Sequence, residues 1–162
     1  SSVKPILDSR GKGKQAFNPF YVFGRTQGLN RSGIKLLTPT FSKFPRFLLD
    51  KDETAFFTNG YGVYLNPHMD SLFESSPISE PQNLDIVQRI LNSMVMHYYV
   101  TKTSVAIDGG YPCYQKNFIE KFTIPNLNES DISAIREMSD SQFEDFIEKT
   151  YQISLPEPNL DS

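Results

Sequence analysis

Cysteine is almost missing from this 162-residue chain. Cys113 is the single cysteine, so no internal disulfide can form and a cysteine-based zinc site is excluded. One unpaired cysteine agrees with a reducing compartment, and we expect a cytoplasmic protein. A length of 162 residues is typical of one domain with its own core.

Long apolar runs are missing as well. None approaches the ~18 to 20 residues that a membrane-spanning helix needs, and the first residues, Ser1 to Pro5, contain no apolar core of a secretion signal. Hydrophobic residues make up 38% of the chain, enough for a packed interior, while 11 prolines indicate a loop-rich surface. The composition predicts a soluble globular domain.

The motifs of cofactor and phosphate chemistry are absent from the sequence. No Gly-x-Gly-x-x-Gly follows a predicted strand, and residues 11–14 (Gly-Lys-Gly-Lys) lack the spacing and the Ser or Thr of a phosphate-binding loop. Enzymes that methylate the exocyclic amine of adenine usually carry Asn/Asp/Ser-Pro-Pro-Tyr/Phe. The nearest stretch, Asn18-Pro19-Phe20, lacks the second proline, and we interpret it as the entry to a strand.

A nucleophilic or metal centre is equally hard to assemble. Cys113 would need a histidine partner, and neither His68, in an expected loop, nor His97, in an apolar helix, has supporting residues around it. We expect His97 to be a partly buried structural residue. The acids of residues 129–148 fall at spacings typical of solvated helix faces. The chain by itself is predicted to be non-catalytic.

Charge is distributed unevenly, although the net charge is only -3. Residues 1–50 carry nine bases and two acids, a net charge of +7, and residues 51–125 carry -3. Residues 126–162 carry two bases and nine acids, a net charge of -7. This asymmetry indicates one face that meets a polyanion and another that meets solvent or a partner. On charge alone, two solvated faces of unlike sign explain it equally well.

Short aromatic and β-branched runs, separated by Gly, Asn, Pro and Asp, indicate a sheet in the first half of the chain. We expect its strands at residues 20–23, 34–37, 46–49 and 55–57. Residues 50–53 should form a hairpin turn, and Asn59-Gly60 a bulge or a position of positive φ. A loop is expected at residues 67–82 and a sharp backbone turn at Gly109-Gly110.

Helical periodicity dominates the second half. After Asn83, which suits an N-cap, apolar residues recur every three or four positions as far as Tyr98, and this predicts one helix with a broad buried face. Residues 128–131 and 139–142 have the composition of helix starts, the second fitting the Ser-x-x-Gln capping box. The last helix should bury a stripe of four residues: Phe143, Phe146, Ile147 and Tyr151.

Two ordered sets of short motifs stand out. The first contains Phe23-Gly24-Arg25-Thr26-Gln27-Gly28-Leu29-Asn30, then residues 35–40 (Lys-Leu-Leu-Thr-Pro-Thr), 45–47 (Pro-Arg-Phe) and 59–62 (Asn-Gly-Tyr-Gly). The second contains residues 90–93 (Ile-Leu-Asn-Ser), 98–99 (Tyr-Tyr), Ser104, 109–111 (Gly-Gly-Tyr), 114–116 (Tyr-Gln-Lys) and 122–125 (Phe-Thr-Ile-Pro). In order and spacing they resemble the target-recognition region of TaqI-like adenine-specific DNA methyltransferases of prokaryotic type II and IIG restriction-modification systems.

The resemblance implies an α/β (α+β) fold, in which a twisted mixed or antiparallel sheet with flanking helices is similar to the target-recognition domains of type I specificity subunits. It implies a recognition core at residues 17–125. From the residues themselves we expect a lead-in at 1–16 that ends a longer region, C-terminal helices at 126–155 that pack on the same domain, and a frayed tail at 156–162. Because catalytic and cofactor motifs are missing, we expect a piece of a parent protein that transfers a methyl group from S-adenosylmethionine to adenine; a nuclease fused upstream stays an open alternative. The expected partners are double-stranded DNA and the parent's catalytic domain.

The implied function assigns DNA contacts to three groups of residues. Arg and Gln can bond guanine and adenine edges through two atoms, so Arg25 and Gln27 are expected to read bases. One set of cations and hydroxyls is expected to hold phosphates: Lys35, Thr38, Thr40, Ser42, Lys43 and Arg46. A second basic and aromatic surface is expected from Lys102, Thr103, Ser104, Gly109, Gly110, Tyr111, Tyr114 and Lys116. For the two tyrosines, packing into a core or hairpin is an equal alternative.

A second hypothesis is a protein-interaction module whose acidic C-terminal helices dock on a methyltransferase or nuclease partner. The hypotheses predict different surfaces. DNA binding requires the lysines and arginines of residues 25–46 and 102–121 to converge on one concave face, whereas an interaction module should expose an apolar patch. A self-contained hydrolase would require a pocket that joins His68 or His97 to Cys113 or a serine.

Overall fold

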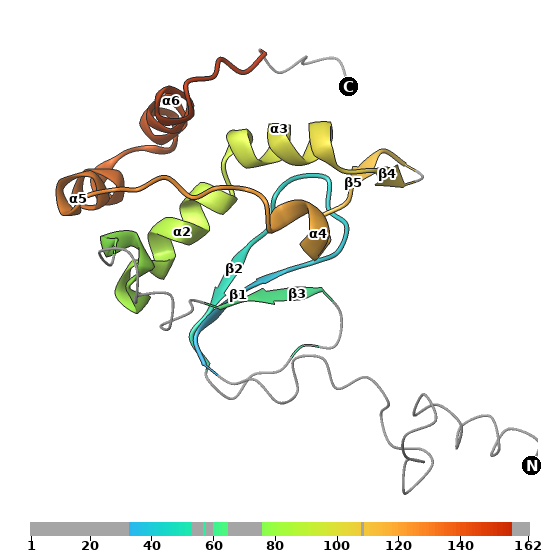
Figure 1. Ribbon diagram of the computed structural model, residues 1–162, viewed down its shortest axis with the longest axis horizontal. Coiled ribbons are helices and arrows are strands. Elements are labelled where there is room, and N and C mark those ends of the chain that lie inside the picture. The colour runs from blue at the N-terminus through green and yellow to red at the C-terminus, as the bar shows by residue number, and fades with distance from the viewer. Residues whose placement is uncertain (1–32, 53–56, 58–59, 65–75, 108, 157–162) are drawn as a thin grey trace, which may run out of the picture.

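The computed structural model describes residues 33–52, 57, 60–64, 76–107 and 109–156. This part of the chain is a mixed α+β structure with small antiparallel sheets and several α-helices (Figure 1). The α+β fold class is therefore confirmed. The predicted strand at 20–23, most of the one at 55–57 and the base-reading candidates Arg25 and Gln27 lie outside the described residues.

The larger sheet has the order β2-β1-β3 and is antiparallel throughout. Its strands are β1 (Lys35–Thr38), β2 (Leu48–Asp50) and β3 (Tyr61–Val63). Strands β1 and β2 begin one and two residues further along the sequence than predicted. Leu36 of the central strand lies opposite Leu49 on one side and Val63 on the other. Thus β2 pairs with the strand before it, and β3 occupies the opposite edge of β1.

Gly60 leads the chain into β3 in the predicted positive-φ conformation, with φ at +95°. A Cβ atom at this position would lie 2.3 Å from the carbonyl oxygen of Thr38. Both the backbone angle and the close approach of β1 therefore require glycine.

The single helix predicted after Asn83 is two helices, α2 (Leu84–Leu91) and α3 (Met94–Thr103). Ser93 has an extended backbone and accepts a hydrogen bond from the Met96 N–H, so that it caps α3. The break rotates the second helix, and Met94 and Tyr98, predicted on the buried face, are exposed.

The sequence predicts that Asn83 caps α2, but its side chain makes no capping hydrogen bond there. Its amide donates to the carbonyl of Pro77 at 2.8 Å. This bond joins two short 3-10 turns, η2 (Pro77–Ser79) and η3 (Pro81–Asn83), which occupy the end of the expected loop.

Three further helices follow: α4 (Lys116–Ile119), α5 (Glu129–Glu137) and α6 (Asp140–Tyr151). Both predicted helix starts at residues 128–131 and 139–142 are confirmed, each as a reciprocal capping box. The apolar stripe of α6 is confirmed too. Phe143 and Ile147 are buried, while Phe146 and Tyr151 are partly buried against the core.

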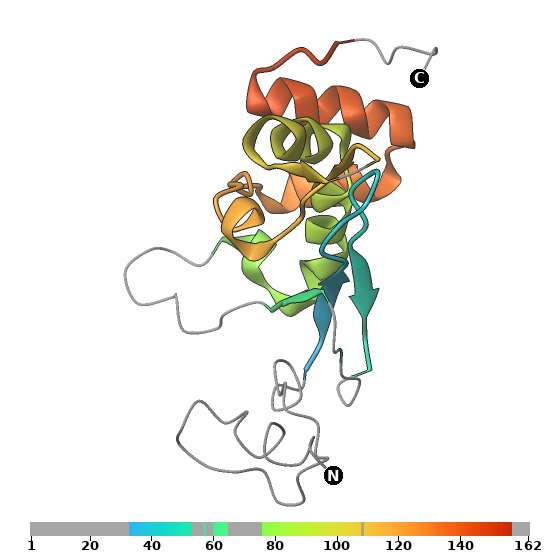
Figure 2. The same cartoon turned by 90° about the vertical axis from the view of Figure 1, so that its right-hand side faces the viewer.

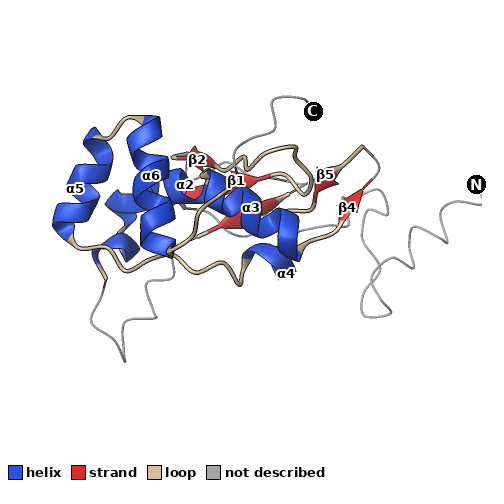
Figure 3. Cartoon of the chain, turned by 90° about the horizontal axis from the view of Figure 1, so that it is seen from above, coloured by secondary structure: helices blue, strands red, loops and turns tan. Residues whose placement is uncertain are grey.

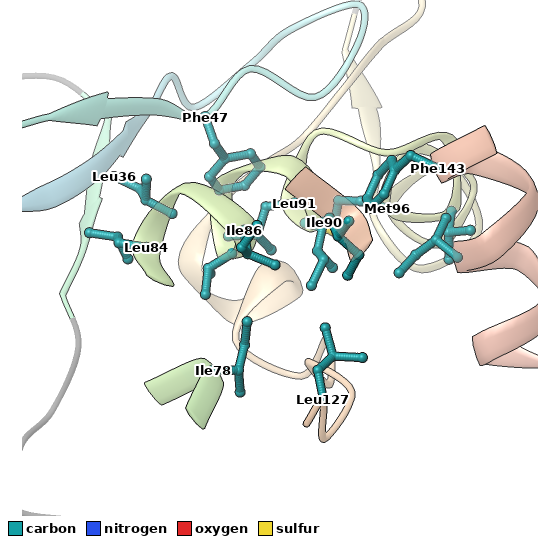
Figure 4. Packing of buried hydrophobic residues seen from close by; sticks show 14 of the residues in the cluster. Leu36, Phe47, Ile78, Leu84, Ile86, Ile90, Leu91, Met96, Leu127 and Phe143 are labelled. Carbon is teal, nitrogen blue, oxygen red and sulfur yellow. The ribbon is translucent and has the colours of Figure 1, made fainter. Parts of the chain in front are cut away.

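The core lies around α2, which contacts the sheet on one side and α5 on another (Figure 4). Leu36 of β1 and Phe47 before β2 pack with Leu84 and Ile90 of α2, and Phe143 reaches the same cluster from α6. Residues from both halves of the chain thus share one hydrophobic core.

Two arginines fasten the C-terminal helices to α2. Arg89 donates to the carbonyls of Ile135 and Met138 at the end of α5, and its guanidinium lies 4.5 Å from the ring centre of Phe143. Arg136 of α5 pairs in the opposite direction with Asp85 of α2 at 3.3 Å. The Ile135 carbonyl also accepts a long bond, 3.4 Å, from the Met138 N–H, so Arg89 adds donors to the last turn of α5 from another element.

Within the described ranges, no helix is both long enough and apolar enough to cross a membrane.

Candidate nucleic-acid interface

The connection between β1 and β2 extends away from the sheet and lies along β5 (Tyr111–Pro112) (Figures 1 and 2). The N–H of Tyr114 donates to the carbonyl of Thr40 at 2.7 Å, and Phe41 forms an isolated antiparallel bridge with Cys113. The two segments in which the sequence predicted phosphate contacts are therefore adjacent.

A small hairpin forms the outer end of this region. β4 (Ala106–Ile107) pairs with β5, and Gly109 and Gly110 turn the chain between them with φ of +87° and +73°. The predicted sharp turn is confirmed. The hairpin and α5 lie at opposite ends of the described part of the molecule (Figure 3).

Two exposed rings, each with a lysine beside it, lie in the loop and the helix next to this hairpin. Phe44 is 52% exposed, with Lys43 Nζ 5.8 Å from its ring centre. Tyr98 of α3 is 38% exposed, with Lys102 Nζ 5.3 Å from its ring centre. Together with Phe41, Arg46 and the 44% exposed Tyr111, these residues form what we call the basic-aromatic surface.

Beneath this surface, Tyr114 and His97 anchor the connection to α3. Tyr114 is fully buried, and its hydroxyl lies 3.3 Å from Nδ1 of His97. His97 in turn packs against Phe44, with ring centres 5.2 Å apart. Burial lowers the pKa of His97, which favours a neutral ring at pH 7. His97 is thus the partly buried residue that was predicted.

The basic-aromatic surface is positive in charge. Among the described residues of 40–46, 94–107 and 109–113 there are three cations, Lys43, Arg46 and Lys102, and no Asp or Glu. Asp108 lies outside the described residues. The ion pairs seen in the described part of the chain involve none of these three cations. The acids concentrate instead on α5 and α6.

Lys35, predicted to hold a phosphate, lies in the interior. Its side chain is 0% exposed, and its ammonium is 2.9 Å from the Asp50 carboxylate. The same ammonium donates to the carbonyls of Gly33 and Asp52. Three acceptors therefore satisfy its three donors, and no face of Lys35 is turned to a ligand.

The other predicted contacts divide by exposure. Thr38, Ser42 and Tyr114 are buried, and Thr40 and Ser104 are partly buried. The Ser104 hydroxyl accepts the N–H of Cys113, so it holds the hairpin to α3. The exposed members are Lys43, Arg46, Lys102, Thr103, Gly109, Gly110, Tyr111 and Lys116.

Lys116 stands apart from the basic-aromatic surface. It begins α4, pairs with Glu120 at 3.8 Å and borders a groove of about 460 Å³. The groove wall is mainly apolar and includes Phe47, Val63 and Phe122. In the described residues, no cluster of three or more His, Cys, Asp or Glu could hold a metal ion.

Phe41, Phe44 and Tyr98 were not among the predicted site residues. A ring between Lys43 and Pro45, in a basic stretch, is a signal that could have drawn attention to Phe44. Tyr98 was not predicted as a site residue because it falls in the apolar repeat that predicts the buried face of the helix. Comparisons of the chain with protein-family models, with curated proteins and with solved structures gave no match.

Proposed function

We propose that this chain binds double-stranded DNA through the basic-aromatic surface, as the non-catalytic target-recognition part of an adenine-specific DNA methyltransferase. The observation that carries the proposal is the contact of residues 40–44 with residues 111–114 and, through Phe44 and His97, with α3, which brings the loop that carries Lys43 to the helix that carries Lys102. The described residues of 40–46, 94–107 and 109–113 include no Asp or Glu. A duplex is a dense line of negative charge, and such a surface attracts it.

The class of parent protein follows from the resemblance of residues 17–125 to TaqI-like recognition regions. Under this proposal, S-adenosylmethionine and the methyl transfer belong to the parent's catalytic domain, and this chain supplies target specificity. Arg25 and Gln27 keep their proposed role as base readers.

Three cations are proposed to hold phosphates: Lys43, Arg46 and Lys102. They are exposed, and they lie on the loop and the helix that meet beside the hairpin. Lys35, Thr38 and Tyr114 are left out of the proposal because their side chains are buried. Phosphate contacts position a protein on DNA without specifying sequence.

The test is the salt dependence of binding to a labelled duplex of mixed sequence. The three proposed phosphate contacts should contribute about -2.7 to the slope of log K against log salt concentration, because each contact contributes about -0.9. Lys43→Ala or Lys102→Ala should each flatten the slope by about 0.9. Lys149→Ala on α6 is the matched control and should leave the slope unchanged. Binding that is independent of salt in the unsubstituted chain would reject the proposal.

A second candidate function is docking on a protein partner, such as the parent's catalytic domain. Val105, Ile107 and Leu48 expose apolar side chains, which are typical of interface cores. Val105→Ser with Ile107→Ser should then weaken association with the purified catalytic domain while the salt slope for DNA stays unchanged. If the double variant instead changes the salt slope for DNA and leaves association with the catalytic domain unchanged, the hairpin belongs to the DNA-binding surface.

A further inference from the structure

Two exposed rings of the basic-aromatic surface stand beside lysines. Phe44 has Lys43 near its ring, and Tyr98 has Lys102. Phe44 is supported by His97, whose ring centre lies 5.2 Å away, yet half of its side chain is exposed. Neither ring belongs to the hydrophobic core cluster. The fold therefore gains little from keeping these rings at the surface.

An aromatic ring beside a cation matches the two parts of a nucleotide. The ring can stack on the flat face of a base, while the lysine contacts the adjacent phosphate. In an intact duplex, however, the faces of each base are covered by the base pairs above and below. A ring on the protein surface can stack only on a base that has left the helical stack.

We propose that Phe44 and Tyr98 stack on unpaired or unstacked bases, so that the surface favours DNA in which a base pair is opened. This inference rests on the proposed DNA-binding function. The lysines supply affinity for any DNA, and the rings supply the preference for an opened site. Charge favours a nucleic acid as the occupant of these rings, because the described part of the surface has three cations and no acid.

The experiment compares two labelled duplexes of the same sequence, one fully paired and one with a single bulged base. The bulged duplex should bind about 10-fold more tightly, because base stacking on an aromatic side chain is worth about that factor or more. Phe44→Leu and Tyr98→Leu keep apolar side chains without the ring and should each reduce the preference. Tyr98→Phe keeps a ring and should retain it.

Leu48→Ala is the control, since Leu48 is exposed on β2 and carries no ring. It should leave the preference unchanged, and Lys43→Ala should weaken both duplexes alike. Equal affinity for the two duplexes would overturn this inference while the proposed DNA binding stands. A preference that survives both leucine substitutions would also overturn it. Failure of the chain to bind either duplex would contradict the proposed function itself.

Discussion

Replacing Arg89 with methionine should release the C-terminal helices from α2. Arg89 donates to the carbonyls of Ile135 and Met138, the second at 2.8 Å, and lies against the ring of Phe143. Its side chain is 24% exposed, so most of the side chain is shielded from water. Methionine keeps the apolar stem but leaves both carbonyls without this donor.

The expected loss follows from these contacts. Hydrogen bonds to a charged group contribute about 1.5 kcal/mol each at the lower end of their range, and the contact with the ring adds about 0.5 kcal/mol. The ion pair with Asp140 adds nothing, because that carboxylate is fully exposed. We expect Arg89→Met to lower the free energy of unfolding by about 3.5 kcal/mol, or Tm by roughly 7 to 14 °C.

Urea denaturation measures this loss, and hydrogen exchange locates it. Amides of α5 and α6 should lose more protection than those of α2. Asp140→Asn is the control, because it removes only the ion pair of Arg89 with a fully exposed carboxylate and leaves both carbonyl contacts in place. It should change the free energy of unfolding little. A loss as large as that of Arg89→Met would refute the capping role of Arg89.

Two further predictions concern the sheet. The hydrogen bond from Lys35 is the main reason that the pKa of Asp50 is lowered from 3.8. A lowered carboxyl pKa stabilises the fold above pH 3.8, and this stability is lost as the pH falls through the pKa of the folded state. Lys35→Met should therefore reduce stability at pH 7, make the loss of stability in acid shallower and leave DNA affinity unchanged. An unaltered acid denaturation profile would contradict the buried ion pair. Gly60→Ala should destabilise the fold by more than the ~1 to 2 kcal/mol of a strained φ, because its Cβ would meet the Thr38 carbonyl. Gly33 is also at positive φ but has open space around it, so Gly33→Ala should cost only the backbone strain. Thermal melts of the two variants compare these losses directly, and equal melting temperatures would speak against the close approach at Gly60.

Local signals were sufficient to predict several elements. The capping boxes at residues 128–131 and 139–142 involve atoms three residues apart, so their sequence predicts them. The glycine turn at Gly109-Gly110 is equally local. The break at Ser93 was missed because apolar residues continue on both sides of it, and the serine cap interrupts the backbone without interrupting the composition.

Contacts between distant segments could not be predicted in the same way. Lys35 has the sequence context of a surface cation, and only the register of β1 against β2 places it beside Asp50. The basic-aromatic surface depends on the bridge between Phe41 and Cys113, which lie far apart in the chain. The sequence identified both segments as candidates, and the fold brings them into contact.

The most direct test of the central claim is the salt dependence of DNA binding by a chain in which Lys43, Arg46 and Lys102 are all replaced by alanine. The three cations should contribute about -2.7 to the slope for a mixed-sequence duplex, and the triple variant should lose this contribution between about 50 and 200 mM salt. A variant with Lys149→Ala should behave like the unsubstituted chain. A triple variant that keeps the full slope would show that DNA, if bound, is held elsewhere and would contradict the account.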